Sequence, residues 1–183
     1  MHFSLIGLPG SGKSTIGRHL ARQWKLPFLD SDHVIEQRIG CSIKAYFEAY
    51  GEASFRDVEK AVLSDLLISE QPCILSTGGG AILHPSNRFA LQARSTVFYL
   101  QSLPEDIARR LRNDVTRPLM QGEDPLKKLR SLLEVRGPLY VSTAHYIIDA
   151  ARQNTAQVSR KICMQVELAG LLPSSTHPQK IQD

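Results

Sequence analysis

A glycine-rich segment near the N-terminus constrains the possible folds more than any other feature of the sequence. Residues 7–15 read GLPGSGKST and fit the phosphate-binding pattern GxxxxGK[ST]. Glycines at these positions let the backbone wrap closely around phosphate oxygens, and the loop N–H groups point inward at the start of a helix. The apolar run at 3–6 predicts a buried strand before the loop, and apolar residues at helical spacing in 13–24 predict a helix after it. The segment therefore predicts a strand, a phosphate loop and a helix.

Two side chains of this loop have roles that follow from the chemistry of ATP. Lys13 can neutralise the β- and γ-phosphates, and the hydroxyl of Ser14 can ligate Mg²⁺. The sequence therefore predicts a protein that binds ATP and Mg²⁺ and phosphorylates a hydroxyl group on a small anionic metabolite.

Strands and helices alternate along the rest of the chain. Further strands are predicted at 28–30, 73–75, 96–100 and 146–148, and helices at 33–39, at 43–69 with a break at Gly51, from Pro104, at 125–140 and at 155–168. This alternation is typical of a parallel α/β sheet covered by helices on both faces, in which ligands bind at the carboxyl ends of the strands. Gly7, Asp30, Asp32 and Gly78 all follow predicted strand ends, so we expect them to lie close together.

The length and composition limit the kinds of protein this can be. A chain of 183 residues holds one domain with a full core but not two. We expect a single domain at 1–169, a lid in the aperiodic polar segment 113–124, and a disordered tail at 170–183. No apolar run approaches the roughly 20 residues needed to cross a bilayer. The basic residues behind the net charge of +4 are dispersed, so we expect a cytoplasmic protein that contacts neither membrane nor nucleic acid.

Two aspartates follow the second predicted strand. Asp30 and Asp32 are two residues apart, and an extended segment would point both side chains the same way. The strand at 73–75 ends without a carboxylate, so the acidic residue that P-loop enzymes place near Mg²⁺ must come from elsewhere. We assign Asp30 to the Mg²⁺ shell and Asp32 to the acceptor hydroxyl, as an orienting group or a base. Helix capping is an alternative for either aspartate, and one aspartate could serve both purposes.

Glycines and arginines elsewhere give weaker signals. The triple glycine at 78–80 would let a ligand approach the backbone, although it also suits a flexible turn. Taken singly, Arg56, Arg117 and Arg136 read as solvated or ion-paired surface residues. Phosphoryl transfer nevertheless needs cationic groups brought over the phosphates while water is excluded. These residues stay candidates on chemical grounds.

Taken in order, these motifs resemble those of shikimate kinase. The resemblance spans about 3–168 and rests on GLPGSGKSTIG, DSD from Asp30, FRDVE from Phe55, STGGGA from Ser76, RPL from Arg117 and RGPLY from Arg136. It implies phosphorylation of the 3-hydroxyl of shikimate by ATP, on the route to chorismate and the aromatic amino acids. It also implies a nucleoside monophosphate kinase-like fold with a five-stranded parallel sheet of order 2-3-1-4-5, in a monomer.

The resemblance also assigns roles to individual residues. It implies ATP binding by Gly10, Ser11, Gly12, Lys13, Ser14, Thr15, Arg110, Arg117 and Asn154, Mg²⁺ binding by Ser14 and Asp30, and shikimate binding by Asp32, Arg56, Gly78, Gly79, Gly80 and Arg136. Lys13, Asp32 and Arg117 would be catalytic. The planar fork of arginine suits a carboxylate, and two such forks select acids over neutral sugars.

Two alternatives share part of this pattern. A related small kinase of the gluconate or nucleoside monophosphate type would share the phosphate loop and lid but not the paired arginines with the triple glycine. A nucleotide-switch regulatory protein would hydrolyse ATP slowly and signal by conformation. The second alternative predicts a water-positioning residue and a protein-binding surface, and neither is identifiable in the sequence.

Overall fold

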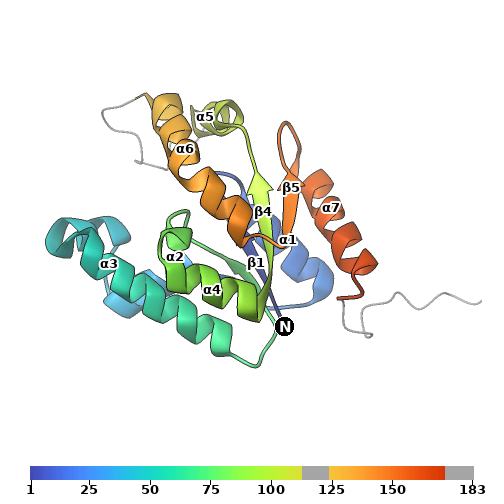
Figure 1. Cartoon of the computed structure of the whole chain (residues 1–183), viewed down its shortest axis with the longest axis horizontal. Helices are drawn as coiled ribbons and strands as arrows, with labels where there is room; N and C mark the ends of the chain where they lie inside the picture. Colours follow the sequence, from blue (N-terminus) through green and yellow to red (C-terminus); the bar gives the residue numbers. More distant parts are fainter. Residues whose placement is uncertain (113–123, 172–183) are drawn as a thin grey trace, which may run out of the picture.

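Five parallel strands form the central sheet of this computed structural model, which describes residues 1–112 and 124–171 (Figure 1). Across the sheet the strands are β2 (Phe28–Asp30), β3 (Ile74–Ser76), β1 (His2–Ile6), β4 (Ser95–Gln101) and β5 (Tyr146–Asp149). Each neighbouring pair is parallel. The predicted fold class and the strand order 2-3-1-4-5 are confirmed.

Alternating side chains of the central strands divide the core into two layers. On one face, Phe3 and Leu5 of β1 pack against α1 (Lys13–Trp24) and α7 (Thr155–Leu168). The other face is covered by α3 (Ile43–Ile68), α4 (Pro85–Arg94), α5 (Pro104–Arg112) and α6 (Pro125–Thr143). Successive strand residues point to opposite faces, so each central strand contributes to both layers. The phosphate loop therefore starts from a strand that is buried on both sides.

Two shorter elements complete the arrangement. The helix α2 (Ser31–Ile39) packs on α3 around the buried side chains of Ile35 and Val62, and a 3₁₀ turn η1 (Ala81–Leu83) follows the triple glycine. The predicted break at Gly51 is confirmed, because this residue has φ 78° and ψ 174° inside α3. Positive φ favours glycine, which explains why the chain bends there.

The helix α4 was missed by the sequence analysis. Its burial pattern gives the reason, since only Asn87 and Leu91 are buried while Phe89 is 74% exposed. One apolar residue in contact with the core gives no helical periodicity to detect. The start signal was present, because His84 caps the helix through Ser86 N–H and a proline follows at the first helical position.

Parts of the predicted lid and tail lie outside the described residues. Of the segment 113–124 the structure describes only Asp124, which caps α6 by accepting from Leu126 N–H at 3.0 Å. Arg117 falls outside the described residues. Of the tail 170–183, residues 170 and 171 are described, and Leu171 packs partly buried against the core. Among the helices that the structure describes, none has the length and apolar character that a membrane span requires.

A buried histidine anchors the first strand. His2 is 3% exposed, with Nε2 2.8 Å from the Ser69 carbonyl and Nδ1 3.2 Å from the Cys73 sulfur. Because a carbonyl only accepts, Nε2 carries the proton and Nδ1 accepts from the thiol. Burial is the main cause that lowers the pKa of His2 below 6.5, and the N-terminal charge adds to it. His2 is therefore held neutral in the fold.

We predict that this histidine makes the protein sensitive to acid. Below the unfolded pKa the unfolded chain binds a proton that folded His2 resists, so His2 itself contributes a loss in the free energy of unfolding as the pH drops from about 7 to 5. Asp32, whose pKa is raised, contributes in the opposite direction. Relative to wild type, His2→Phe should lose this contribution and so lose less stability between pH 7 and 5, and His33→Gln, at an exposed histidine, should not. Urea unfolding across this range measures both slopes, and a wild-type slope in His2→Phe would contradict the prediction.

Candidate functional site

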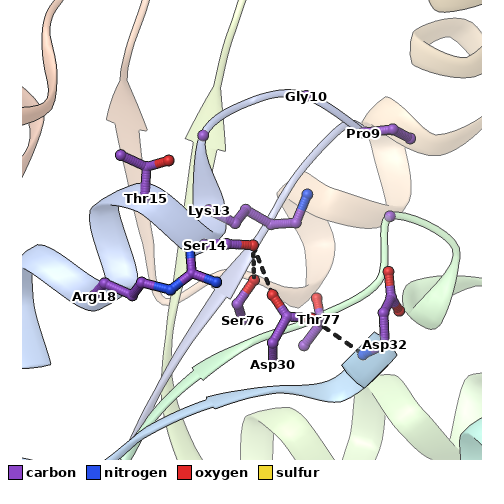
Figure 2. Close-up of a pocket in the computed structure, with 12 residues that line it drawn as sticks. Pro9, Gly10, Lys13, Ser14, Thr15, Arg18, Asp30, Asp32, Ser76 and Thr77 are labelled. Atoms are coloured by element: carbon purple, nitrogen blue, oxygen red, sulfur yellow. Dashed lines mark hydrogen bonds between the residues drawn. The ribbon is translucent and has the colours of Figure 1, made fainter. Parts of the chain in front are cut away.

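The carboxyl ends of β1, β2 and β3 meet at a cavity of about 550 Å³ (Figure 2). Its lining residues come from the phosphate loop, α1, the two aspartates and the turn after β3: Pro9, Gly10, Gly12, Lys13, Ser14, Thr15, Arg18, Asp30, Asp32, Ser76, Thr77 and Gly79. Parallel strands place their carboxyl ends at one edge, which is where such sheets bind ligands. The structure thus brings together the predicted groups that follow strand ends.

The backbone of the phosphate loop requires its glycines. Gly7 has φ 147°, and a Cβ there would lie 2.9 Å from the Leu100 carbonyl oxygen of the neighbouring strand. Gly12 has φ 94° at the N-cap of α1 and brings no side chain to cap the helix. The first amides of α1 are therefore available to an anion in the cavity, and the helix dipole favours one there.

Lys13 places its ammonium group inside this loop. The side chain is 7% exposed, and Nζ donates to the carbonyls of Gly7 at 3.0 Å and Leu8 at 2.9 Å. The loop carbonyls thus hold the cation at the wall of the cavity. An anionic ligand bound by the loop amides would meet this charge directly.

Three oxygen-bearing side chains converge beside Lys13. The Ser14 hydroxyl donates to Asp30 Oδ2 at 2.6 Å and lies 3.3 Å from the Ser76 hydroxyl (Figure 2). Mg²⁺ prefers oxygen ligands, keeps several waters and needs only one or two protein groups in addition to substrate phosphates. This donor set fits Mg²⁺. Residues 1–112 and 124–171 contain no cluster of three histidine, cysteine or acidic side chains that could hold a metal without such help.

The two aspartates are brought together differently from the prediction. Asp30 ends β2, but Asp32 lies in the first turn of α2, which begins at Ser31 and not at His33. The premise that both side chains project from one extended segment is therefore wrong. Asp30 is also the N-cap of α2, because its Oδ1 accepts from Asp32 N–H at 3.2 Å. One oxygen of Asp30 caps the helix while the other accepts from Ser14.

The environment of Asp32 makes its carboxyl group hard to ionise. Burial is the largest cause and the negative charge of Asp30 the second, and together they raise the pKa of Asp32 to about 6, while Lys13 opposes the rise. A raised carboxyl pKa is characteristic of groups that exchange protons near neutral pH. Asp32 is therefore mostly ionised at pH 7, because this pH lies only about one unit above its pKa.

Each glycine of the triple glycine approaches a different part of the site. An added Cβ at Gly78 would lie 2.5 Å from Asp32 Oδ1. One at Gly79 would lie 2.8 Å from Pro9 Cδ, and one at Gly80 would lie 2.6 Å from Arg56 Nη1. Any side chain here would displace an aspartate, the phosphate loop or an arginine. The flexible-turn alternative does not account for these close approaches.

Arg56 is held behind Gly80 by two glutamates. Its Nη1 donates to Glu59 at 2.8 Å and its Nη2 to Glu52 at 2.8 Å, and its Cζ lies 5.3 Å from the centre of the Phe55 ring. Glu59 is 2% exposed. Burial raises the pKa of Glu59, and the charges of Arg56 and Arg136 oppose the rise. Glu59 is therefore a buried carboxylate that pairs with Arg56 and feels the charge of Arg136, the two arginines of the predicted substrate clamp.

Sequence reasoning gave Glu59 no role. The signal that could have found it is its position three residues after Arg56, which is contact distance on a helix. The same spacing is common on solvated helix faces, so burial alone distinguishes the two cases. Sequence reasoning also gave no role to Pro9, Arg18 and Thr77, which line the cavity.

The predicted nucleotide-side residues lie at a second, smaller hollow. Arg110 and Asn154 line a space of about 210 Å³ together with Ser11, Gly12 and Thr15 of the phosphate loop. The Asn154 side chain accepts from Gln157 N–H at 3.0 Å and so caps α7. In the part of the chain that the structure describes, neither Arg56 nor Arg136 lines the first cavity.

Known proteins resemble this chain in both sequence and structure. A family model described as shikimate kinase matches residues 9–167. A shikimate kinase from Paracidovorax citrulli (strain AAC00-1) is 54% identical over 173 residues, which cover 93% of this chain and 94% of that protein. The structure of shikimate kinase from Acinetobacter baumannii in complex with shikimate has a TM-score of 0.84 and 42% identity, covering 94% of this chain and 95% of that one. A gluconokinase from Sinorhizobium meliloti 1021 has a TM-score of 0.60 at 18% identity, which is a likeness of fold alone.

We predict that Asp32 titrates near pH 6 because Asp30 lies beside it. Asp30→Asn keeps a capping oxygen but removes the negative charge, so the pKa of Asp32 should fall, while remaining above 3.8 because burial persists. The charge of Glu36 contributes less to the raised pKa than that of Asp30, so Glu36→Gln should change the pKa of Asp32 less. Carboxyl ¹³C NMR titration measures each value. An unchanged or higher pKa of Asp32 in Asp30→Asn would refute this account of the site.

Proposed function

The chain belongs to the shikimate kinase family, and we propose that its cavity transfers the γ-phosphoryl group of ATP to the 3-hydroxyl of shikimate, giving shikimate 3-phosphate and ADP. One observation carries the proposal for the site. The phosphate loop, Asp30, Asp32 and Gly79 line one cavity, and Arg56 lies against Gly80 next to it, so the groups proposed to bind phosphate and the acid are close together. A phosphotransferase that acts on an anionic acceptor needs this combination.

The loop and the start of α1 would hold ATP. The amides of Gly10, Ser11, Gly12, Ser14 and Thr15 would bind the β- and γ-phosphates, and Lys13 would add a cation there. We assign Mg²⁺ to Ser14 and Asp30, which have the oxygen donors it prefers. When bound, Mg²⁺ neutralises charge that develops on the phosphates.

Asp32, Arg56 and Arg136 would hold the acceptor. The two arginines are assigned to the shikimate carboxylate, since Arg56 is bonded to Glu59 and the charge of Arg136 also acts on that carboxylate, which brings the two cations near each other. Asp32 accepts a hydrogen bond from the reacting hydroxyl and orients it. The hydroxyl oxygen attacks the γ-phosphorus, the bond to the bridging oxygen breaks, and ADP leaves with that electron pair. The proton of the hydroxyl passes to Asp32, whose pKa of about 6 leaves it ionised at neutral pH.

Three further residues are proposed to contact the nucleotide. Arg110 and Asn154 are assigned to the nucleotide, in keeping with their place at the second hollow. Arg117 is assigned to the phosphates as part of a lid, although it lies outside the described residues. The single domain at 1–169, the monomeric state and a cytoplasmic location likewise remain predictions.

A coupled ADP-release assay tests the proposed function. We expect rapid ADP release with shikimate and only background release with gluconate or nucleoside monophosphates, because only shikimate offers both a carboxylate and a correctly placed hydroxyl. Preference for gluconate or a nucleoside monophosphate would favour the related small kinases. Slow hydrolysis that no acceptor accelerates would favour a nucleotide switch.

We predict that the substrate clamp depends on the shape of its arginines. Arg136→Lys keeps the charge but loses the bidentate fork, so the KM for shikimate should rise about tenfold or more while the KM for ATP stays within about twofold. Arg130→Lys, at an exposed arginine on the same helix, is the matched control and should change neither value. Steady-state kinetics with each substrate varied in turn measures the split. An equal loss of affinity for ATP and shikimate would show that Arg136 does not bind the carboxylate.

A further inference from the structure

A buried tyrosine hydroxyl contacts the backbone of the triple glycine. Tyr140 on α6 is fully buried, and its hydroxyl donates to the Gly79 carbonyl at 2.6 Å. Its ring stacks on Tyr99 of β4 with centroids 5.0 Å apart and an interplanar angle of 19°. Stacking on Tyr99 of the sheet therefore holds the ring of Tyr140 in place, and this keeps its hydroxyl against the Gly79 carbonyl.

The same hydroxyl lies beside one of the proposed substrate arginines. Arg136 precedes Tyr140 by four residues on α6, so the two side chains share a helix face. Burial raises the pKa of Tyr140, and the nearby charge of Arg136 is the first effect that opposes the rise. The phenol stays neutral, so its oxygen can accept from Arg136 while its proton is donated to Gly79.

Gly79 in turn lies tightly against the phosphate loop. A Cβ at Gly79 would come within 2.8 Å of Pro9 Cδ, and both residues line the main cavity. Tyr140 thus lies between Arg136 on its own helix and Gly79, which borders the loop that would hold ATP. In a close-packed interior, a shift of one such group is passed on to its neighbours.

We propose that Tyr140 is a positioning residue for the acceptor: its hydroxyl fixes Arg136 relative to Gly79, and so sets the distance between the shikimate carboxylate and the phosphate loop. This inference rests on the proposed function. The alternative is that Tyr140 only fills the core. Tyr99 provides a comparison for that alternative. It stacks on Tyr140 and is only 2% exposed, so it fills the same part of the core.

Tyr140→Phe tests the proposal, with Tyr99→Phe as the matched control. Both variants keep the stacked rings and remove one tyrosine hydroxyl. We expect Tyr140→Phe to raise the KM for shikimate about tenfold, the scale of one lost hydrogen bond, and to leave the KM for ATP within about twofold. Tyr99→Phe should leave both KM values unchanged. An unchanged shikimate KM in Tyr140→Phe, or the same change in both variants, would overturn the proposal.

A double-mutant cycle separates positioning from packing. Because Tyr140 is proposed to act through Arg136, Tyr140→Phe should have little further effect in the Arg136→Lys background, whereas a packing role would give additive effects. If Tyr140→Phe does not fold, the wild-type protein still allows a test: the Tyr140 hydroxyl proton, observed by NMR, should shift when shikimate binds, and no shift would contradict the proposal. A wild-type enzyme inactive on shikimate would instead refute the proposed function.

Discussion

The register of the parallel strands determines where every polar group of the site lies. Ser76 of β3 is paired with Leu5 of β1 on one side and with Asp30 of β2 on the other. These three strands therefore end level with one another, and their following residues emerge at one edge. The phosphate loop, Asp30 and the triple glycine meet there because the backbone hydrogen bonds between the strands fix where each strand ends. A shift of one residue in either pairing would separate Asp30 from Ser14 and turn side chains to the opposite face.

The site concentrates buried charge in a way that opposes folding. The pKa values of Asp32 and Glu59 are both raised, so the folded protein binds their protons more strongly than the unfolded chain does. Such carboxyls contribute stability at low pH that is lost as the pH rises, for Asp32 between its ordinary pKa of 3.8 and its raised pKa of about 6, so at neutral pH its ionised form destabilises the fold. The two apolar layers on either side of the sheet offset this cost. The arrangement is consistent with a site selected for its chemistry and not for stability.

Close backbone approach is the second constraint on the site. The turn at 78–80 has room for no side chain, because an aspartate, the phosphate loop and an arginine each occupy the space that a Cβ would take. Tyr140 then holds the middle glycine by its carbonyl. The glycines thus serve contact and not flexibility, and the turn connects the ATP side of the cavity with the proposed acid side. Through this hydrogen bond, a substitution of Tyr140 on α6 would change the position of Gly79 in the cavity.

Much of the fold and the phosphate site was determined by the sequence alone. Apolar runs and their spacing gave the strands, their order followed from the family resemblance, and the pattern GxxxxGKS gave the loop, because local backbone conformation and burial are encoded locally. The helix α4 was not predicted, since only its contacts with the core distinguish it from a polar loop. Glu59, the Tyr140 hydroxyl bond and the raised pKa of Asp32 were decided by the tertiary structure. Each depends on groups far apart in sequence that exclude water together, and no local pattern records which distant residues will do so.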